Sequence, residues 1–142
     1  MANRKSGGTA VERNEVDRAA AGVRRAIGCL IALLGDEDLV TICGAFETLV
    51  SIGAFAAEPL ATALPRAASV RHRAAIMNCL MELAPVARPP VLRAMLRASQ
   101  RDCDPALRAS AGQNLVALTG AIVMDDIARR NGNLPTKPPS GS

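Results

Sequence analysis

The sequence predicts an all-α fold built from stacked helical hairpins, a solenoid of about three repeats. One apolar pattern occurs three times, at residues 41–53, 72–84 and 107–119. When the three segments are superposed, pairs of apolar residues fall in register at intervals of just over thirty positions: Leu49/Ile52, Leu80/Leu83 and Leu115/Leu118. A repeat of this length is typical of units that bury their apolar faces only by stacking on their neighbours. We therefore expect Leu115 to be a buried core leucine.

The composition also favours helices over strands. Of the 142 residues, 49% are hydrophobic and 27 are alanine, the strongest helix former. Phe46 and Phe55 are the only aromatic residues in the sequence. Strands are typically rich in aromatic and β-branched residues, so a β-sheet core is not expected. A chain of this length forms one domain with a modest core.

The first helix is predicted between residues 14 and 34. Residues 1–13 are polar and contain two glycines, and we expect a flexible basic N-terminal tail there. Asn14 is a favourable N-cap. Apolar residues then recur every three or four positions as far as Leu34, and Gly35 ends the helix. The repeat domain is predicted to extend from this helix to residue 130.

Turn and capping residues divide the middle of the chain into further helices. The acidic turn at 36–38 precedes a helix that stops at Gly53, and a short helix follows over about 56–64. Ser69 is positioned to cap a helix over residues 70–83. Two prolines open its partner helix, over residues 91–99.

The strongest local helix start in the sequence is Asp104-Pro105, a capping residue followed by proline at the first helical position. The helix that begins there is predicted to reach Leu118 and to break at Gly120, and a last helix continues to about residue 130. Residues 131–142 contain mostly turn formers and no apolar cluster, so we predict a disordered C-terminal tail.

The segment from Asp102 to Leu118 resembles the HEAT-repeat pattern, in which an Asp-rich turn leads into an apolar residue followed by Arg, here Arg108. The segment that contains His72-Arg73 matches less well, and the one after residues 36–38 lacks the Arg. The resemblance covers roughly residues 22–130. It implies right-handed stacking, with one layer of helices lining a concave surface. It also implies that Arg73 and Arg108 tie each helix to the preceding turn, with Asp102 or Asp104 as the partner of Arg108.

The net charge of the chain is +4, and the charged residues are unevenly distributed along the sequence. Residues 36–65 contain five acidic groups and no basic one, whereas residues 66–101 contain seven arginines and a single acid, Glu82. Arginine pairs with carboxylates and phosphates through two parallel hydrogen bonds. The basic segment is therefore the best candidate for a binding surface.

Three arginines recur every fourth residue within this segment, which places them on one helix face. The HEAT resemblance implies that this face is concave, and two further arginines extend it. The predicted partner-binding residues are Arg66, Arg88, Arg93, Arg97 and Arg101. We expect a noncatalytic interaction module that binds an acidic segment of a partner protein. The alternative is a solvated basic face that pairs with the acidic 36–65 region of the same chain.

Other functions have weaker support in the sequence. Nucleic-acid binding through the same arginines is possible by charge, but no aromatic platform for unstacked bases is expected. An accessory role in an enzyme complex is a third alternative. No spacing of residues indicates a catalytic centre, metal site or cofactor site, and His72 is expected to be a partly buried structural residue. A homodimer or a place in a larger complex suits so short an array.

Two further expectations concern the cysteines and the membrane. Three of the four cysteines fall within apolar helical stretches, where cysteine behaves as a small hydrophobe. We therefore expect core packing of the cysteines, with a redox or metal role as the alternative: Cys29, Cys43, Cys79 and Cys103. Residues 39–57 carry Glu47 as their single charge, and a central carboxylate costs about 2.5–3.5 kcal/mol on insertion. Gly53 also falls at a predicted turn, so we expect a cytoplasmic protein without a membrane span.

Overall fold

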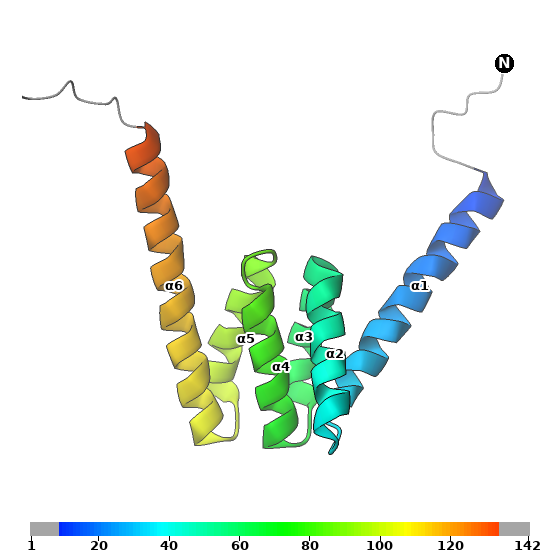
Figure 1. Cartoon of the computed structure of the whole chain (residues 1–142), viewed down its shortest axis with the longest axis horizontal. Helices are drawn as coiled ribbons and strands as arrows, with labels where there is room; N and C mark the ends of the chain where they lie inside the picture. The colour runs from blue at the N-terminus through cyan, green and yellow to red at the C-terminus, as the bar shows by residue number, and fades with distance from the viewer. Residues whose placement is uncertain (1–8, 134–142) are drawn as a thin grey trace, which may run out of the picture. The chain divides into compact units, whose positions relative to one another are not determined.

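The computed structural model describes residues 9–133, and this part of the chain is helical throughout, without strands (Figure 1). It has five helices of fourteen residues or more and the seven-residue α3. The prediction of an all-α protein is confirmed. The chain divides into two compact units, Met1–Ala94 and Met95–Ser142, and each is described by itself below.

The first helix begins earlier than the sequence predicted. Helix α1 spans Ala10–Leu33, and its N-cap is Thr9 rather than Asn14. The Thr9 side chain accepts a hydrogen bond from the Glu12 amide, and the Glu12 carboxylate accepts one from the Thr9 amide. This reciprocal capping box satisfies two amides that a helix start otherwise leaves unpaired. Residues 10–13 therefore belong to α1 and Thr9 caps it, and the rest of the predicted tail lies outside the described residues.

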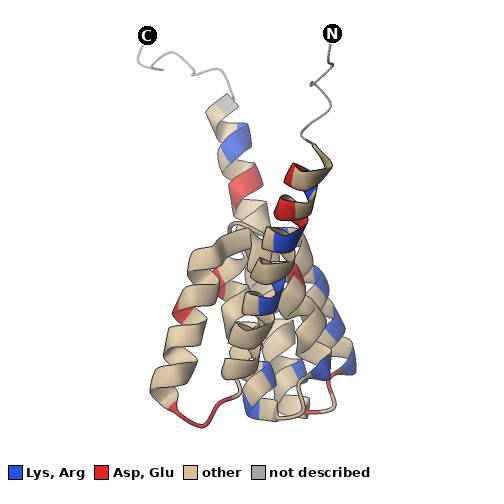
Figure 2. Cartoon of the chain, turned by 90° about the vertical axis from the view of Figure 1, so that its right-hand side faces the viewer, with Lys and Arg blue, Asp and Glu red and all other residues tan. Residues whose placement is uncertain are grey.

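Helices α2 and α3 lie where the sequence placed them. Helix α2 spans Leu39–Ile52, and its N-cap is Asp38, at the end of the acidic turn that is red in Figure 2. It ends at Gly53, whose φ of 81° is in the left-handed region that glycine adopts without strain. A 3-10 turn at Gly53–Ala56 leads into α3, Ala57–Ala63, and a second one follows at Leu64–Arg66.

Helix α4, Val70–Leu83, has the predicted cap, because the Ser69 hydroxyl accepts a hydrogen bond from the His72 amide at 3.0 Å. Within the first unit, α4 contacts both α2 and α3, and α1 contacts α2 and α3. Helices α2 and α4 lie side by side and run in the same direction, with α3 behind them (Figure 1). Their apolar faces form the core of this unit. Its largest fully buried side chains include Ile27, Leu34, Leu49, Leu60, Ile76 and Leu80.

Helix α5 spans Arg88–Arg101, and the second unit begins within it. Helix α6 is continuous over Pro105–Asn133, so the predicted break at Gly120 is wrong. Glycine costs a helix interior only about 1 kcal/mol relative to alanine, which neighbouring helical residues can offset when no proline follows. The helix also extends past residue 130 to Asn133, and residues 134–142 of the predicted disordered tail lie outside the described part.

Three helices of this fold begin at positions that repeat the spacing of the apolar pattern. Their N-caps are Asp38, Ser69 and Asp104, and a leucine follows eleven positions later in each helix. Those leucines do not share one environment. Leu49 and Leu80 are fully buried, whereas Leu115 is half-buried and lines a surface hollow. The expectation of a core position for Leu115 is therefore wrong, and Leu118 of the same helix is the buried one.

One stretch, Leu39–Arg66, is long and apolar enough to cross a membrane by length and composition, and only 17% of its most apolar window is buried. The backbone divides this stretch, because the positive φ of Gly53 ends α2 after fourteen residues. A helix of that length spans about 21 Å, less than the hydrocarbon core of about 30 Å. The absence of a membrane span stays a prediction.

Candidate functional site

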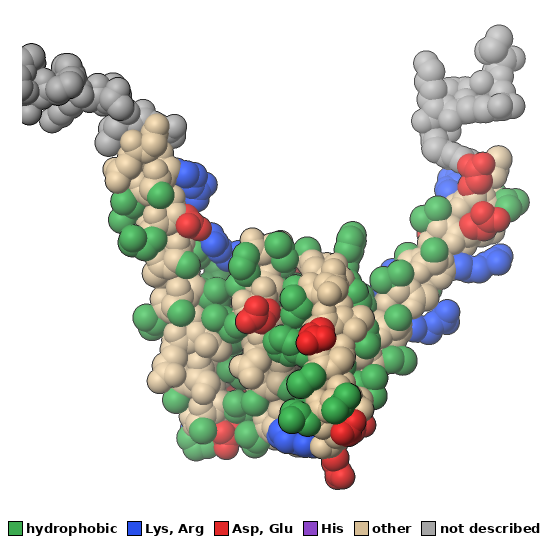
Figure 3. Space-filling model, in the orientation of Figure 1, with side chains coloured by type: hydrophobic (Ala, Val, Ile, Leu, Met, Phe, Trp, Pro, Cys, Tyr) green, Lys and Arg blue, Asp and Glu red, His purple; other side chains and the backbone are tan. Residues whose placement is uncertain are grey.

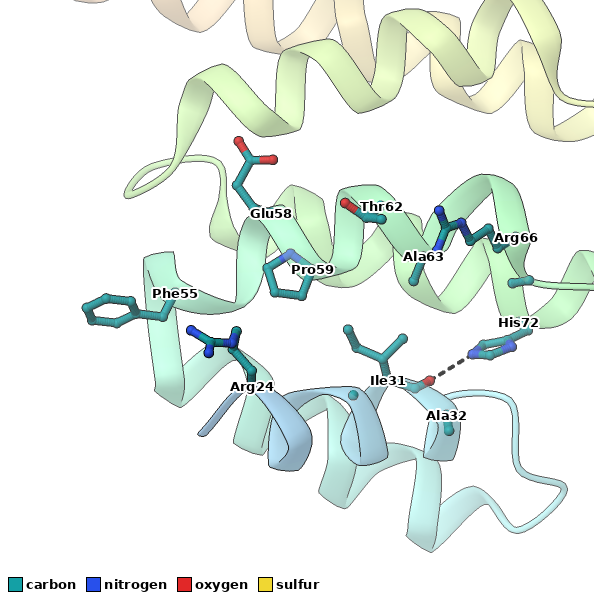
Figure 4. A pocket seen from close by; sticks show the side chains of 12 residues that line it. Arg24, Ile31, Ala32, Phe55, Glu58, Pro59, Thr62, Ala63, Arg66 and His72 are labelled. Atoms are coloured by element: carbon teal, nitrogen blue, oxygen red, sulfur yellow. Dashed lines mark hydrogen bonds between the residues drawn. The ribbon is translucent and has the colours of Figure 1, made fainter. Parts of the chain in front are cut away.

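A groove of about 840 Å³ lies between α1 and α3 within the first unit. We call it the α1–α3 groove. Its apolar walls are formed by Gly28, Ile31, Ala32, Phe55, Pro59, Ala63 and Ala67, and its polar ones by Arg24, Glu58, Thr62, Arg66 and His72. Figure 4 shows Ile31 of α1 facing Pro59 and Ala63 of α3. The groove is thus an apolar trough between two helices with charged groups at its edges.

Phe55 stands at one end of the groove and is 81% exposed (Figure 4). It lies in the 3-10 turn that follows Gly53, so the end of α2 determines its position. An aromatic side chain this exposed leaves a large apolar area in water. Exposed aromatic residues beside an apolar groove are common anchors for binding partners.

Two arginines border the groove, and only one of them was predicted as a site residue. Arg66 lies near His72, and Arg24 of α1 lies nearer Phe55 (Figure 4). Neither arginine makes an ion pair or a side-chain hydrogen bond with another residue of the described range 9–133. Both guanidinium groups therefore remain available to carboxylates of a partner. Arg24 was not predicted as a site residue, because it lies off the apolar stripe of its helix and outside the basic segment 66–101.

Arg93 has a partner within the chain. Its Nη2 lies 2.6 Å from Oε1 of Glu58, on the edge of the α1–α3 groove, and both side chains are largely exposed. This pair agrees with the alternative that the basic stripe pairs with the acidic 36–65 region. Surface ion pairs of this kind contribute about 0–1 kcal/mol, so the contact can yield to a competing carboxylate.

The other predicted arginines lie along α5. Arg97 and Arg101 are exposed and follow Arg93 at intervals of four, so all three share one helix face. Arg88 is half-buried and has interactions with other residues. Arg97 and Arg101 belong to the second unit, whereas Arg66 belongs to the first. A shared concave surface for all five arginines stays a prediction.

His72 has the structural role that the sequence indicated. Its Nε2 lies 2.8 Å from the carbonyl oxygen of Ile31, and its ring packs against Gly35 so closely that a Cβ there would lie 2.8 Å from it. Arg71 donates a hydrogen bond to the Gly35 carbonyl at 3.2 Å. The start of α4 therefore satisfies carbonyl groups at the end of α1 and fixes one wall of the groove.

Arg73 and Arg108 do tie their helices to the preceding turns, through backbone carbonyls. Arg73 is buried and donates to the carbonyl oxygens of Ala67 at 2.9 Å and Ala68 at 3.2 Å. Arg108 donates to the carbonyl oxygen of Asp102 at 2.6 Å. Asp102 is thus the partner that the HEAT resemblance implied, and this hydrogen bond is to its main-chain carbonyl. In both cases the acceptor lies six residues before the arginine.

Most of the cysteines are not core residues. Cys79 is fully buried, whereas Cys29, Cys43 and Cys103 are exposed, so the expectation of core packing is wrong for these three. The apolar stretches that contain Cys29 and Cys43 are wider than the face each helix buries. Burial raises the pKa of the Cys79 thiol to about 11, with a smaller contribution from the Glu82 carboxylate. Among residues 9–133 no cluster of His, Cys, Asp or Glu has the arrangement of a metal site.

Comparison of the chain with protein-family models, with curated proteins and with solved structures finds no match.

Proposed function

We propose that this chain is a noncatalytic protein-interaction module that binds an acidic, amphipathic segment of a partner protein in the α1–α3 groove. The observation that carries the proposal is the apolar trough bordered by Arg24 and Arg66, two arginines without an ion pair in the described chain. An amphipathic helix places apolar side chains in such a groove at spacings of three and four residues. Its flanking carboxylates then lie within reach of the two guanidinium groups.

The proposal includes a scaffold of HEAT-like helical hairpins stacked with a right-handed turn. Two features support it. Asp36 and Asp102 each accept a hydrogen bond from the amide two residues later, at 2.8 and 2.9 Å, ahead of the caps Asp38 and Asp104. Arg73 and Arg108 then share the same tie to the carbonyl six positions before them. Each feature recurs in two of the three predicted repeats, and such internal similarity supports an array of stacked units.

A rigid groove favours binding because few groove residues have to become ordered when the partner binds. Ile31, Pro59 and Ala63 lie on helices, and the His72 hydrogen bond to Ile31 holds α4 against the end of α1. The groove is therefore formed before the partner arrives, which lowers the entropic cost of association. The Glu58 carboxylate, which pairs with Arg93, is the acidic group on the groove edge. Carboxylates of the partner are therefore favoured beside Arg24 or Arg66 and disfavoured beside Glu58.

The test uses a designed probe, a fluorescein-labelled amphipathic helix with leucines every three or four residues and glutamates beside them. We expect the probe to bind the full chain, with fluorescence anisotropy falling as salt is added, because the arginine contacts are exposed. Replacing both Arg24 and Arg66 by Glu is expected to weaken binding at least about tenfold, since two charge-assisted contacts of about 1 kcal/mol or more are lost.

Matched controls define the outcome. Arg25→Glu changes an exposed arginine of the same helix that does not line the groove, and it should bind like the unchanged protein. A probe with lysine in place of glutamate should bind weakly. Equal weakening by Arg25→Glu contradicts groove binding and leaves only a general charge effect. Tighter binding of duplex DNA or RNA than of the acidic helix, lost with the same two arginines, would replace the proposal with a nucleic-acid function.

A further inference from the structure

The last helix, α6, has a second apolar stripe on the face opposite the buried one. Leu107, Ala111 and Leu118 are buried, and Asn114 on the same side donates a hydrogen bond to Sδ of Met95 in α5 at 3.6 Å. The helix turns 100° per residue, so positions spaced alternately by four and three fall on one line. The line directly opposite the buried face contains Ala109, Gln113, Val116, Gly120, Val123 and Ile127. We call these residues the outer stripe.

The outer stripe is largely uncovered. Val116 is 74% exposed and Val123 is 50% exposed, and the adjoining Met124 is 65% exposed. With Gly120 they line a shallow apolar hollow of about 540 Å³. Hydrophobic side chains are visible on the surface of α6 in Figure 3. Contiguous exposed apolar side chains on one helix indicate a surface that binds another protein surface.

Gly120 lies in the middle of this stripe, and the fold of a single copy does not require glycine at this position. A Cβ at this position would meet nothing within 4 Å. Glycine destabilises a helix interior relative to alanine, and no turn occurs there, because α6 continues to Asn133. A helix from another molecule that crosses at Gly120 can use the missing side chain, since small residues allow two helix axes to approach closely.

We propose that the outer stripe is covered by α6 of a second copy of this chain, in an antiparallel crossing centred near Gly120. Spacings of four and three are those of a coiled-coil seam, in which side chains of one helix fill gaps between those of the other. A two-fold dimer is the commonest closed assembly, and it brings the same patch of each copy together. Val116 of one copy then lies beside Met124 of the other.

The charges of α6 select both the occupant and its direction. No charged residue occurs from residue 109 to residue 124, so the same surface from a second copy brings no repulsion. Two charged residues near the C-terminal end of α6 flank the outer stripe, Asp126 and Arg130, which pair with each other at 2.9 Å. A parallel pair would place each of them beside its own equivalent, with like charges adjacent. An antiparallel pair centred at Gly120 places them beside residues 110–114 of the partner helix, which are uncharged.

The area available sets the strength of this contact. Four large apolar side chains from each copy bury about 800 Å² in total, roughly half the area of a standard stable interface. We therefore expect a reversible dimer with a Kd of about 10–100 µM.

The first test is sedimentation equilibrium of the full chain over a dilution series that spans this range. The expected mass rises with concentration from 14.8 kDa toward twice that value. Replacing Val116 and Val123 together by Glu should keep the protein monomeric, with an unchanged helical circular dichroism spectrum because both side chains point to solvent. Val86→Glu, at an exposed valine between α4 and α5, is the matched control and should still dimerise. A mass independent of concentration, or a dimer that survives the double substitution, overturns the proposal.

A second test addresses the crossing point. With the exposed cysteines Cys29, Cys43 and Cys103 changed to serine, Gly120→Cys should form a disulfide-linked dimer on mild oxidation. Val116→Cys should do so far more slowly, because it faces Met124 of the other copy. Gly120→Leu should leave a folded monomer and weaken the dimer at least tenfold. Equal cross-linking at both positions refutes the antiparallel crossing, and a stronger dimer with Gly120→Leu refutes a crossing at Gly120.

Discussion

Leu80→Ala tests whether the apolar register of the sequence is also the register of the core. Leu80 has no exposed surface and lies in the C-terminal half of α4. The substitution removes three carbon atoms, which at about 0.8 kcal/mol for each buried methylene group amounts to about 2.4 kcal/mol. The cavity left behind raises the total cost to about 3–4.5 kcal/mol, because close-packed helices relax only in part.

The comparison that makes this prediction sharp is Leu115→Ala. Leu115 occupies the equivalent position, eleven residues after its N-cap, but it is half-buried beside a surface hollow. Solvent already reaches part of its side chain and can fill the space after truncation, so we expect a loss of only about 1 kcal/mol. Leu39→Ala, at a leucine that is 69% exposed, should change stability by less than about 0.5 kcal/mol.

The assay is urea unfolding followed by circular dichroism at the helical minimum. With an m value of about 1.5–2 kcal/mol per molar urea, Leu80→Ala should lower the unfolding midpoint by about 2 M. Leu115→Ala should lower it by about a quarter as much. Equal costs at the two leucines would mean that the sequence register decides burial and that the burial difference reported above is wrong. A cost below about 1 kcal/mol at Leu80 would place α4 outside the core.

Three further results are expected. A maleimide reagent should label Cys29, Cys43 and Cys103 rapidly in the folded protein and spare buried Cys79, whose pKa of about 11 also keeps it a thiol; mass spectrometry of the labelled peptides checks this, and fast labelling of Cys79 would contradict its burial. Asp104→Ala should destabilise α6 by about 0.5–2 kcal/mol through loss of the bond to the Leu107 amide, at 2.9 Å, whereas Asp104→Asn should restore most of it. The pKa of Asp38 should be below its ordinary 3.8 because the Thr41 hydroxyl and amide donate to it. Its contribution to stability should therefore be complete above pH 3.8 and be lost as the pH falls through the lowered folded-state pKa, so that Asp38→Asn and the unchanged protein converge in acid; an NMR titration that finds no lowered pKa contradicts this.

Local signals in the sequence predicted the helices well. Asp38 and Ser69 cap α2 and α4 as expected, and Gly53 ends α2, because a capping side chain and a left-handed glycine act on the backbone next to them. Two local readings failed. The first helix is capped by Thr9 and not by Asn14, because Thr9 forms a capping box with Glu12. Gly120 does not end α6, because a single glycine destabilises a helix interior only slightly.

The site was less predictable, since it depends on which faces meet. Arg66 was predicted as a binding residue from its charge, whereas Arg24 was not, although both line the same groove. The two are far apart in sequence and come together only because α1 packs on α3. Arg93, read as part of a free stripe, lies against Glu58, thirty-five positions earlier in the chain.

The sequence by itself therefore determined the helical class, the positions of most helices and the spacing of their caps, because those depend on interactions within a few residues of the chain. Only the tertiary structure decided that Leu80 is fully buried and Leu115 only half-buried, that three cysteines face solvent, and that Arg24 and Arg66 line one groove. Periodicity shows that a residue lies on an apolar face. Whether another helix covers that face is a property of packing between distant segments, and for the outer stripe of α6 we propose that a second copy provides the cover.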